Sequence, residues 1–304
     1  MKFLNRKFDS KRGDYHKLWN FIINNYRLNN DDTTWTIGRL SDWKHGLWHN
    51  RKLDPSFMAE NCQIWTNIFD DFIGIVIAEE GDSLFHLFAK LNYRLYLYDK
   101  MLDFVEKNWS ERENRLHTEI PEDNEILGNI LMKRGYNKRP DSYTTEYDLQ
   151  KFQISLDLPE GFKVVNMEEN RDYESKLLLY HSGFQNRNSF EEWDMVTFRY
   201  NRESPAYNPE FDFSVIDENG KHVSGCVCFI DFENDYAEIE KVCTHKDYRR
   251  RGLSSGLIQR AFIKLKEIGI AKAYITGYSE EAKGTYKKVG AISCKINYDY
   301  EKKF

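Results

Sequence analysis

A strand-like segment that leads through a glycine turn into a helix is the part of the sequence best suited to chemistry. From Glu238 it reads E-I-E-K-V-C-T-H-K-D-Y-R-R-R-G-L-S-S-G-L, with three arginines directly before Gly252. The first N–H groups of a helix are unpaired and lie at the positive end of its dipole, which favours a bound anion. Glycine lets the backbone come close, serines donate hydroxyls, and arginines add charge. The pattern predicts a phosphate-binding turn made of Arg249, Arg250, Arg251, Gly252, Leu253, Ser254 and Ser255.

The spacing around Gly252 differs from that of two common nucleotide-binding motifs. A Walker loop requires G-x-x-x-x-G-K-[ST] and a dinucleotide fingerprint requires G-x-G-x-x-G, and the turn has neither pattern. A plain surface turn with a solvated run of arginines is the alternative interpretation.

Two carboxylates lie on the strand that precedes this turn. Glu238 and Glu240 are at positions i and i+2, so their side chains share one face of the strand. Each carboxylate raises the pKa of the other, which suits a proton acceptor near neutral pH. A solvent-exposed sheet face is the alternative. His245, just past the strand end, either contacts a substrate or caps the turn, and capping is the simpler expectation.

Together with a pattern on the last helix, the turn resembles the GNAT superfamily of acyl-CoA-dependent N-acyltransferases. Arg249 to Ser254 is similar to the family's pyrophosphate motif R/Q-x-x-G-x-G/A, with serine as the last residue. The family pattern N-x-x-A-x-x-L-Y-x-x-x-G is matched at Ala282, Tyr286 and Gly290. Ser279 replaces its asparagine, which weakens a cofactor hydrogen bond there, and Thr285 replaces its leucine. The resemblance covers residues 160–304 well and the N-terminal half only as a degenerate copy.

The resemblance implies transfer of an acetyl group from acetyl-CoA to a primary amine by direct attack, with acetyl-CoA as co-substrate and no metal. It implies that the pantetheine arm is held, and the thioester carbonyl polarised, by the backbone of Val242, Cys243 and Thr244. A base must take a proton from the amine, and Glu238 is the first candidate with Glu240 as the alternate. Tyr286 would be the acid that protonates the departing thiolate, with core packing as its alternative role.

Alternating helix and strand patterns surround these residues. Strands are expected at 162–167, 211–217, 222–231, 236–244, 273–276 and 291–300. Helices are expected at 169–184 and 190–201, from Gly252 to Gly269, and at 280–289. Asn219-Gly220 between two β-rich runs predicts a hairpin. This order predicts an α/β (α+β) fold with a mixed, mostly antiparallel sheet flanked by helices.

The first half of the chain repeats the end of this order at an offset of 155 residues. Gly290 corresponds to Gly135, the strand 238–244 to Ser83–Ala89, and the helix after Gly252 to Leu97–Lys107. A helix at 15–26, apolar runs at 64–69 and 72–78, and a last strand at 144–149 agree in order. The repeat predicts two tandem GNAT-like domains, 1–150 and 160–304, joined by a linker at 150–161.

The first copy lacks the residues that would bind phosphate. Leu97 stands in the place of Gly252 and Asp99 in that of Ser254, and Asn124 in that of Ser279. Leucine blocks close approach of the backbone and aspartate repels phosphate. We therefore expect the first domain to be a non-catalytic scaffold that completes an acceptor cleft.

The composition is that of a folded protein and argues against several classes of function. The length of 304 residues, with 40% hydrophobic and 15% aromatic, suits two domains of about 150 residues. Because 44 Lys+Arg face 49 Asp+Glu, the chain lacks the bulk attraction of a basic protein to nucleic acid. The five cysteines are odd in number and irregularly spaced, which argues against a disulfide framework and a zinc site.

The remaining expectations concern location, partners and buried side chains. The N-terminus has no apolar leader and no window is apolar enough to span a membrane, so we expect a soluble cytoplasmic protein. Its partner should be a small-molecule amine rather than nucleic acid or a membrane, and it should be a monomer or homodimer. Core packing is the expected role of Cys226, Cys228, Trp35, Trp43, Trp48 and Trp65.

Two other functions stay open at this point. The protein could bind acyl-CoA as a non-catalytic sensor or regulator. Alternatively, the arginine run could serve nucleic acid or an acidic partner. The sequence leaves open which amine accepts the acetyl group and whether other acyl-CoAs are used.

Overall fold

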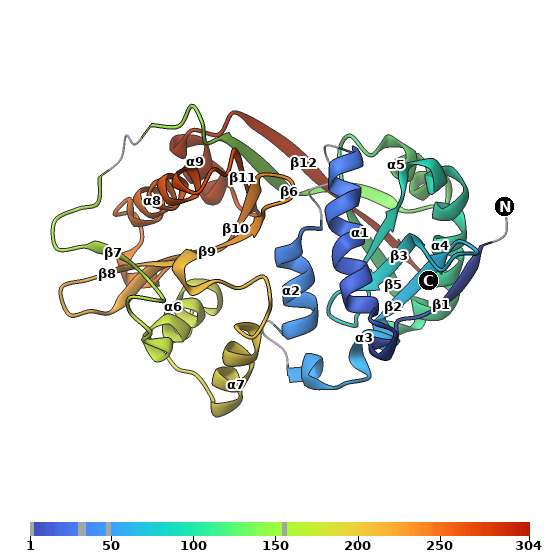
Figure 1. Cartoon of the computed structure of the whole chain (residues 1–304), viewed down its shortest axis with the longest axis horizontal. Helices are drawn as coiled ribbons and strands as arrows, with labels where there is room; N and C mark the ends of the chain where they lie inside the picture. The colour runs from blue at the N-terminus through green and yellow to red at the C-terminus, as the bar shows by residue number, and fades with distance from the viewer. Residues whose placement is uncertain (1–2, 30–34, 47–49, 154–156) are drawn as a thin grey trace. The chain divides into compact units, whose positions relative to one another are not determined.

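The computed structural model describes residues 3–29, 35–46, 50–153 and 157–304 (Figure 1). Two compact units divide the chain: Met1–Thr36, Arg51–Ser142 and Lys295–Phe304 form the first, and Ile37–Asn50 and Tyr143–Cys294 form the second. Compared with the expected domains, residues 37–50 fall in the second unit and the C-terminal residues in the first. Trp48 and residues 154–156 of the expected linker lie outside the described residues.

The second unit is built on a mixed sheet with the strand order β6-β11-β10-β9-β8-β7. All neighbouring strands are antiparallel except β10 and β11, which are parallel. The strands are β7 (Lys163–Asn166), β8 (Asp212–Ile216), β9 (His222–Asp231), β10 (Tyr236–Thr244), β11 (Lys272–Gly277) and the second half of β6 (Asn137–Asp148). The helices are α2 (Ile37–His45), α6 (Tyr173–Gln185), α7 (Glu192–Asn201), α8 (Leu253–Glu267) and α9 (Glu280–Val289). These elements confirm the strand and helix order expected for this part of the chain.

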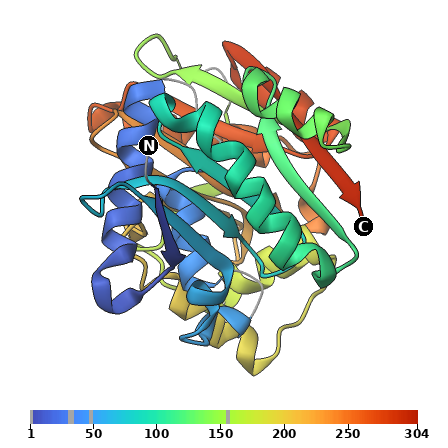
Figure 2. The same ribbon diagram turned by 90° about the vertical axis from the view of Figure 1, so that its right-hand side faces the viewer.

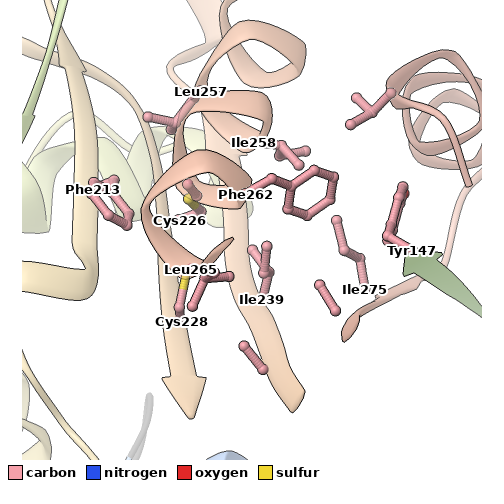
Figure 3. Packing of buried hydrophobic residues seen from close by; sticks show 14 of the residues in the cluster. Tyr147, Phe213, Cys226, Cys228, Ile239, Leu257, Ile258, Phe262, Leu265 and Ile275 are labelled. Carbon is pink, nitrogen blue, oxygen red and sulfur yellow. The ribbon is translucent and has the colours of Figure 1, made fainter. Parts of the chain in front are cut away.

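Helices cover both faces of this sheet. Helix α8 packs on β8, β9 and β10, while α6 packs on β9 and β10 from the other face together with α7 and α2 (Figure 1). Figure 3 shows the core beneath α8, where Leu257, Phe262 and Leu265 lie over the strands. Cys226 and Cys228 of β9 are fully buried in this cluster, which confirms their expected core role.

The first unit contains a second, antiparallel sheet in the order β1-β2-β3-β4. Its strands are β1 (Leu4–Lys7), β2 (Cys62–Thr66), β3 (Phe72–Ala78) and β4 (Phe85–Ala89), and β5 (Arg115–Pro121) pairs with β12 (Ser293–Lys303). The helices are α1 (Asp14–Asn29), α3 (Phe57–Asn61), α4 (Arg94–Trp109) and α5 (Glu125–Lys133). Helix α4, teal in Figure 2, packs on β3 and β4.

The expected repeat is present in the local structure. The order β4, α4, β5, α5, β6 in the first half matches β10, α8, β11, α9, β12 in the second. Asn124 caps the start of α5 and Ser279 caps the start of α9, each by accepting an N–H bond from the residue three positions later. Gly135 and Gly290 follow these helices with positive φ angles of 84° and 107°. The two copies therefore begin and end this helix in the same way.

Three of the four tryptophans that were expected to pack in the core are buried. Trp35, Trp43 and Trp65 are 3%, 0% and 2% exposed, which confirms their core role. Within the described residues, the helices are too short or too polar to cross a membrane.

Candidate functional site

Strands β10 and β11 diverge at the middle of the second unit's sheet. Their parallel pairing covers only Tyr236, Ala237 and Glu238 of β10. Beyond Glu238, β10 continues to Thr244 against β9, and β11 continues to Gly277 against β6. The described part of the sheet is therefore open between the ends of these two strands.

A β-bulge changes the course of β10 just beyond this point. The register with β9 shifts between Glu240 and Cys243, and Lys241 has a left-handed φ of 55°. Before the bulge, Ile239 lies in the core beneath α8; after it, Cys243 packs on the opposite face with residues of α6 and α7. A bulge re-aims the residues around it, and here it does so where the sheet opens.

The turn that follows β10 contains two residues with a left-handed backbone conformation. Arg250 and Gly252 have left-handed φ angles of 63° and 77°, and Gly252 caps α8 without a side-chain hydrogen bond. A Cβ built on Gly252 meets no atom of the chain within 4 Å. The guanidinium of Arg249 donates to the carbonyls of Gly183 and Thr244 at 2.8 and 3.4 Å, which ties the turn to α6 and β10.

A groove of ≈ 570 Å³ connects the end of β10, this turn and one side of α9. It is lined by Val242, Cys243, Thr244, Tyr248, Arg249, Arg250, Gly252, Leu253, Ser254, Ser255, Glu281, Ala282, Gly284, Thr285, Tyr286 and Lys288. The three segments expected to bind the cofactor thus meet in one groove. Glu281 and Lys288 also line the groove and were not predicted from the sequence. Thr285 follows Glu281 by four residues and Lys288 follows it by seven, and this spacing could have placed all three on one face of the helix.

Residues 179–291 match the family model described as the acetyltransferase (GNAT) family. This segment, which carries the groove, is similar to a GNAT acetyltransferase domain. A GCN5-related N-acetyltransferase from Sphaerobacter thermophilus is 15% identical with a TM-score of 0.68, covering 99% of this chain and 95% of that one. A tandem GNAT protein from the clavulanic acid biosynthesis pathway is 8% identical with a TM-score of 0.64, over 99% and 98% of the two chains. An acetyltransferase of the GNAT family from Colwellia psychrerythraea is 9% identical with a TM-score of 0.61, over 99% and 100%.

These similarities confirm the predicted fold of two GNAT-like copies with mixed, mostly antiparallel sheets and flanking helices. Comparison with curated proteins finds no match.

Tyr286 of α9 lines the groove and also belongs to the core cluster beneath α8. It is 5% exposed, and its backbone carbonyl accepts a hydrogen bond from the hydroxyl of Tyr147 at 3.1 Å. Burial and the nearby carboxylate of Glu240 raise the pKa of Tyr286 well above its usual value. Its hydroxyl therefore keeps its proton at neutral pH.

The two candidate bases occupy different surroundings. Glu238 is buried beside α2, where a Cβ on Gly38 would lie 2.7 Å from its Oε2. Glu240 is half-buried, and burial and the carboxylate of Asp42 raise its pKa. The cations Lys241 and Arg39 act in the opposite direction.

Two expected cofactor-binding side chains have other roles in the structure. Arg251 lies with its guanidinium 5.0 Å from the centre of the Tyr248 ring and donates to the carbonyl of Asp247 at 3.2 Å. Ser279 uses its hydroxyl to cap α9. Neither lines the groove within the part of the chain that the structure describes.

His245 and Cys243 have defined chemical states. His245 accepts from the backbone N–H of Asp247 through Nδ1 at 3.3 Å, which confirms the capping role, and burial together with Lys221 lowers its pKa. Burial raises the pKa of Cys243 to about 12. The thiol that lines the groove is therefore protonated and a poor nucleophile.

The first copy has a different turn at the equivalent place. Here α4 begins at Arg94, and its capping residue Tyr93 has a right-handed helical backbone instead of a left-handed one. Leu97 is fully buried within the helix, and Asp99 forms an ion pair with Arg134 at 2.9 Å. This helix begins without the open, glycine-capped turn of α8. Among the described side chains, no group of three or more His, Cys, Asp or Glu residues could hold a metal ion.

Proposed function

We propose that the protein is an N-acetyltransferase that moves an acetyl group from acetyl-CoA to a primary amine. The observation that carries the proposal is the groove in which the end of β10, the glycine-capped start of α8 and Tyr286 of α9 meet. An enzyme of this class must hold a pyrophosphate, a long pantetheine arm and an acyl group in one line. The groove offers an anion-binding turn at one end and ionisable groups near the other.

The residues present fit acetyl-CoA as a co-substrate. The pyrophosphate would be held by the first N–H groups of α8 and by the cations of the turn, because the helix dipole favours an anion at this end. Gly252 leaves open space where a Cβ would point, so phosphate oxygens could come close to the backbone. The opening between β10 and β11 would admit the pantetheine arm beside Val242, Cys243 and Thr244.

When bound, acetyl-CoA would supply the thioester carbonyl that the amine attacks. Glu240 would take the proton that the amine must lose, since burial and the carboxylate of Asp42 raise its pKa and so make it a stronger base than an exposed glutamate. The hydroxyl of Tyr286 would give its proton to the sulfur as the carbon–sulfur bond breaks and the carbon–nitrogen bond forms. The protonated Cys243 argues for this direct route over one through an acetylated cysteine.

The first test is release of CoA from acetyl-CoA in the presence of spermidine, glucosamine or L-lysine. Product thiol can be followed with a chromogenic thiol reagent, and a reaction without acetyl-CoA corrects for the exposed Cys294 of the protein. We expect release that depends on an amine, and a higher melting temperature with acetyl-CoA, because ligand binds only the folded state.

The variant Tyr286→Phe separates an enzyme from a sensor. We expect kcat to fall by about 10²-fold, the lower range for a general acid, with CoA affinity unchanged. Binding of acetyl-CoA without amine-dependent release in the wild-type protein would instead support the non-catalytic sensor. Absence of binding to acetyl-CoA would contradict both functions.

A further inference from the structure

Lys241 occupies a backbone conformation that its residue type disfavours. Its φ of 55° lies in the left-handed region, where the Cβ of any residue except glycine crowds the following carbonyl. Such a conformation persists only where the surrounding structure holds it. In this chain it is the bulge residue between Glu240 and Val242, so its conformation sets where the proposed base and the groove backbone lie.

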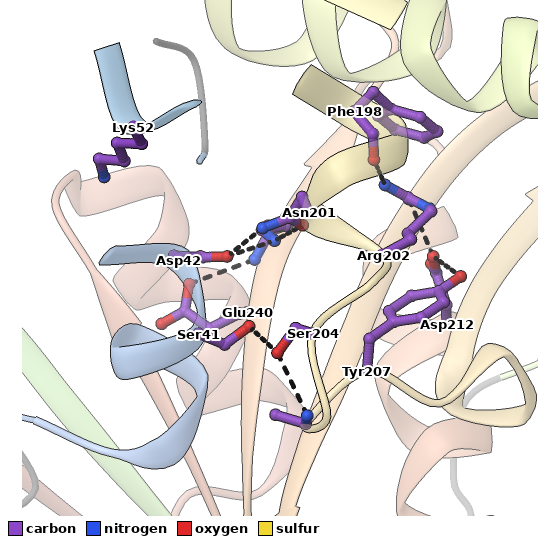
Figure 4. A network of polar contacts seen from close by, with 12 residues as sticks. Ser41, Asp42, Lys52, Phe198, Asn201, Arg202, Ser204, Tyr207, Asp212 and Glu240 are labelled. Carbon is purple, nitrogen blue, oxygen red and sulfur yellow. Dashed lines mark hydrogen bonds and ion pairs between the residues drawn. The ribbon is translucent and has the colours of Figure 1, made fainter. Parts of the chain in front are cut away.

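Two side chains from separate helices, Asp42 and Asn201, hold the ammonium group of Lys241, and Figure 4 labels both of them. Its Nζ lies 2.9 Å from Oδ1 of Asp42 on α2 and 3.0 Å from Oδ1 of Asn201 at the end of α7. The amide of Asn201 donates to the same Asp42 oxygen at 2.8 Å, which closes a triangle. All three residues are buried, with 8%, 7% and 5% of their surfaces exposed for Lys241, Asp42 and Asn201.

The triangle resists any change in the course of β10. If the bulge relaxed to a regular register, the side chain of Lys241 would turn to the opposite face of the strand. The carboxylate of Asp42 and the ammonium would then separate in a buried place, where unpaired charges are strongly unfavourable. The lysine stem, with Nζ 5.3 Å from the centre of the Phe229 ring, adds packing to this anchor.

We propose that Asp42 and Asn201 are positioning residues that hold the β-bulge at Lys241 and thereby align Glu240 and the backbone of Val242 for acetyl transfer. The inference rests on the proposed function for its kinetic consequence. The structural part of the proposal does not depend on that function: it says that the ion pair between Lys241 and Asp42 maintains the left-handed backbone at position 241. The negative charge of Asp42 also raises the pKa of Glu240, so Asp42 acts on the proposed base in a second way.

A matched pair of substitutions tests the proposal directly. Lys241→Ala and Lys241→Gly both remove the ammonium, but only glycine adopts a positive φ without a steric penalty. In Lys241→Ala we expect the bulge to relax and kcat with acetyl-CoA and spermidine to fall by about 10- to 100-fold, the size of effect that a small misplacement has. CoA affinity should change less than kcat, because the turn before α8 that would hold the pyrophosphate is unchanged. Lys241→Gly should recover most of the lost kcat.

Asp42 is tested in the same way. Asp42→Asn should lower kcat by as much as Lys241→Ala does. The double variant Asp42→Asn with Lys241→Gly should have the same kcat as Lys241→Gly alone. Asp212→Asn is the control for loss of a buried lysine partner, since Asp212 pairs with Lys176 at 2.6 Å where both side chains are fully buried. It should lower stability while kcat of the folded protein stays near that of the wild type.

Equal kcat values in Lys241→Ala and Lys241→Gly would overturn the proposal. Crystal structures of the two variants give a readout that needs no turnover: position 241 should be left-handed with glycine and relaxed with alanine. A left-handed alanine would contradict the proposal even if no amine were acetylated. Absence of amine-dependent CoA release in the wild type, with the backbone difference present, would contradict the proposed function and leave the positioning of the bulge supported.

Discussion

Gly252 offers the sharpest test of the anion-binding turn, because the same helix provides its own control. Gly252 precedes α8 with a φ of 77°, and Gly269 follows it with a φ of 90°. A Cβ on either glycine meets no atom of the chain within 4 Å, so alanine brings backbone strain without a steric clash. Of these two glycines, Gly252 lines the groove and Gly269 does not.

The two alanine variants should lose similar stability and differ in binding. Placing alanine in the left-handed region costs roughly 1–2 kcal/mol, which lowers the melting temperature by about 2–8 °C. In Gly252→Ala the new methyl group also occupies open space beside the first N–H groups of α8. Loss of one hydrogen bond to a charged group costs about 1.5–3 kcal/mol, so the Kd for CoA should rise by about 10- to 100-fold.

Titration calorimetry with CoA and thermal melting of both variants measure these effects. We expect Gly269→Ala to melt lower than the wild type and to bind CoA with the wild-type affinity. If Gly252→Ala bound CoA as tightly as Gly269→Ala, the turn before α8 would not be the phosphate site. An equal loss of affinity in both variants would mean that strain in the helix, and not the turn, controls binding.

Three further predictions concern ionisable groups. Glu240→Gln should lower kcat more than Glu238→Gln in the CoA-release assay, and the reverse order would make Glu238 the base. Because the charge of Asp42 raises the pKa of Glu240, Asp42→Asn should move the acidic limb of kcat/KM to lower pH, and an unmoved limb would argue against Glu240. Burial acts to raise the pKa of Asp212, but the charges of Lys176 and Arg202 outweigh it and lower that pKa. The wild type should therefore be more stable than Asp212→Asn above pH ~4, with the difference in unfolding free energy shrinking as pH falls further, as urea unfolding at pH 7 and pH 3 would show.

Local signals were sufficient to predict much of the second unit. The hairpin around Gly220, the strand that runs into the turn at Gly252, and the helix that ends at Gly290 all depend on residues close in sequence. Turn residues and helix caps act over a few positions, so their patterns can be read from one chain. The motif residues of the groove belong to these local segments, which is why most of them were found.

The parts that sequence reasoning missed depend on contacts between distant residues. Asp42 and Lys241 are 199 positions apart, and Asp42 and Asn201 are 159 apart. The helix that carries Asp42 belongs to the first half of the sequence but to the second compact unit, and its own pattern does not indicate the strand on which it packs. The left-handed Lys241 was equally hidden, since lysine gives no local signal for a positive φ.

The bulge also explains why the alternation of side chains along a strand could not show which of the two carboxylates is the better candidate for the base. Positions i and i+2 of a regular strand share a face, and this pattern made Glu238 and Glu240 equivalent. The structure separates them, because Glu238 is covered beside Gly38 of α2 while Glu240 adjoins the bulge and influences Tyr286. A base must reach both an acceptor and the reacting groups, so the interruption of the strand, and not its regular part, identifies the better candidate.

The two copies of the fold contribute unequally to the proposed site, and the physical cause lies in one turn and one helix. In the first copy the helix after β4 begins without a left-handed residue, and Asp99, which stands in the place of Ser254 in the sequence, lies within the helix and pairs with Arg134. The first half of the sequence instead supplies α2, whose Asp42 compensates the buried ammonium of Lys241. A segment limited to residues 160–304 would lack this carboxylate and also the strand β6 that pairs with β11. It would contain every recognised motif residue and still leave a buried charge and an open sheet edge, so the functional unit is larger than the motifs alone indicate.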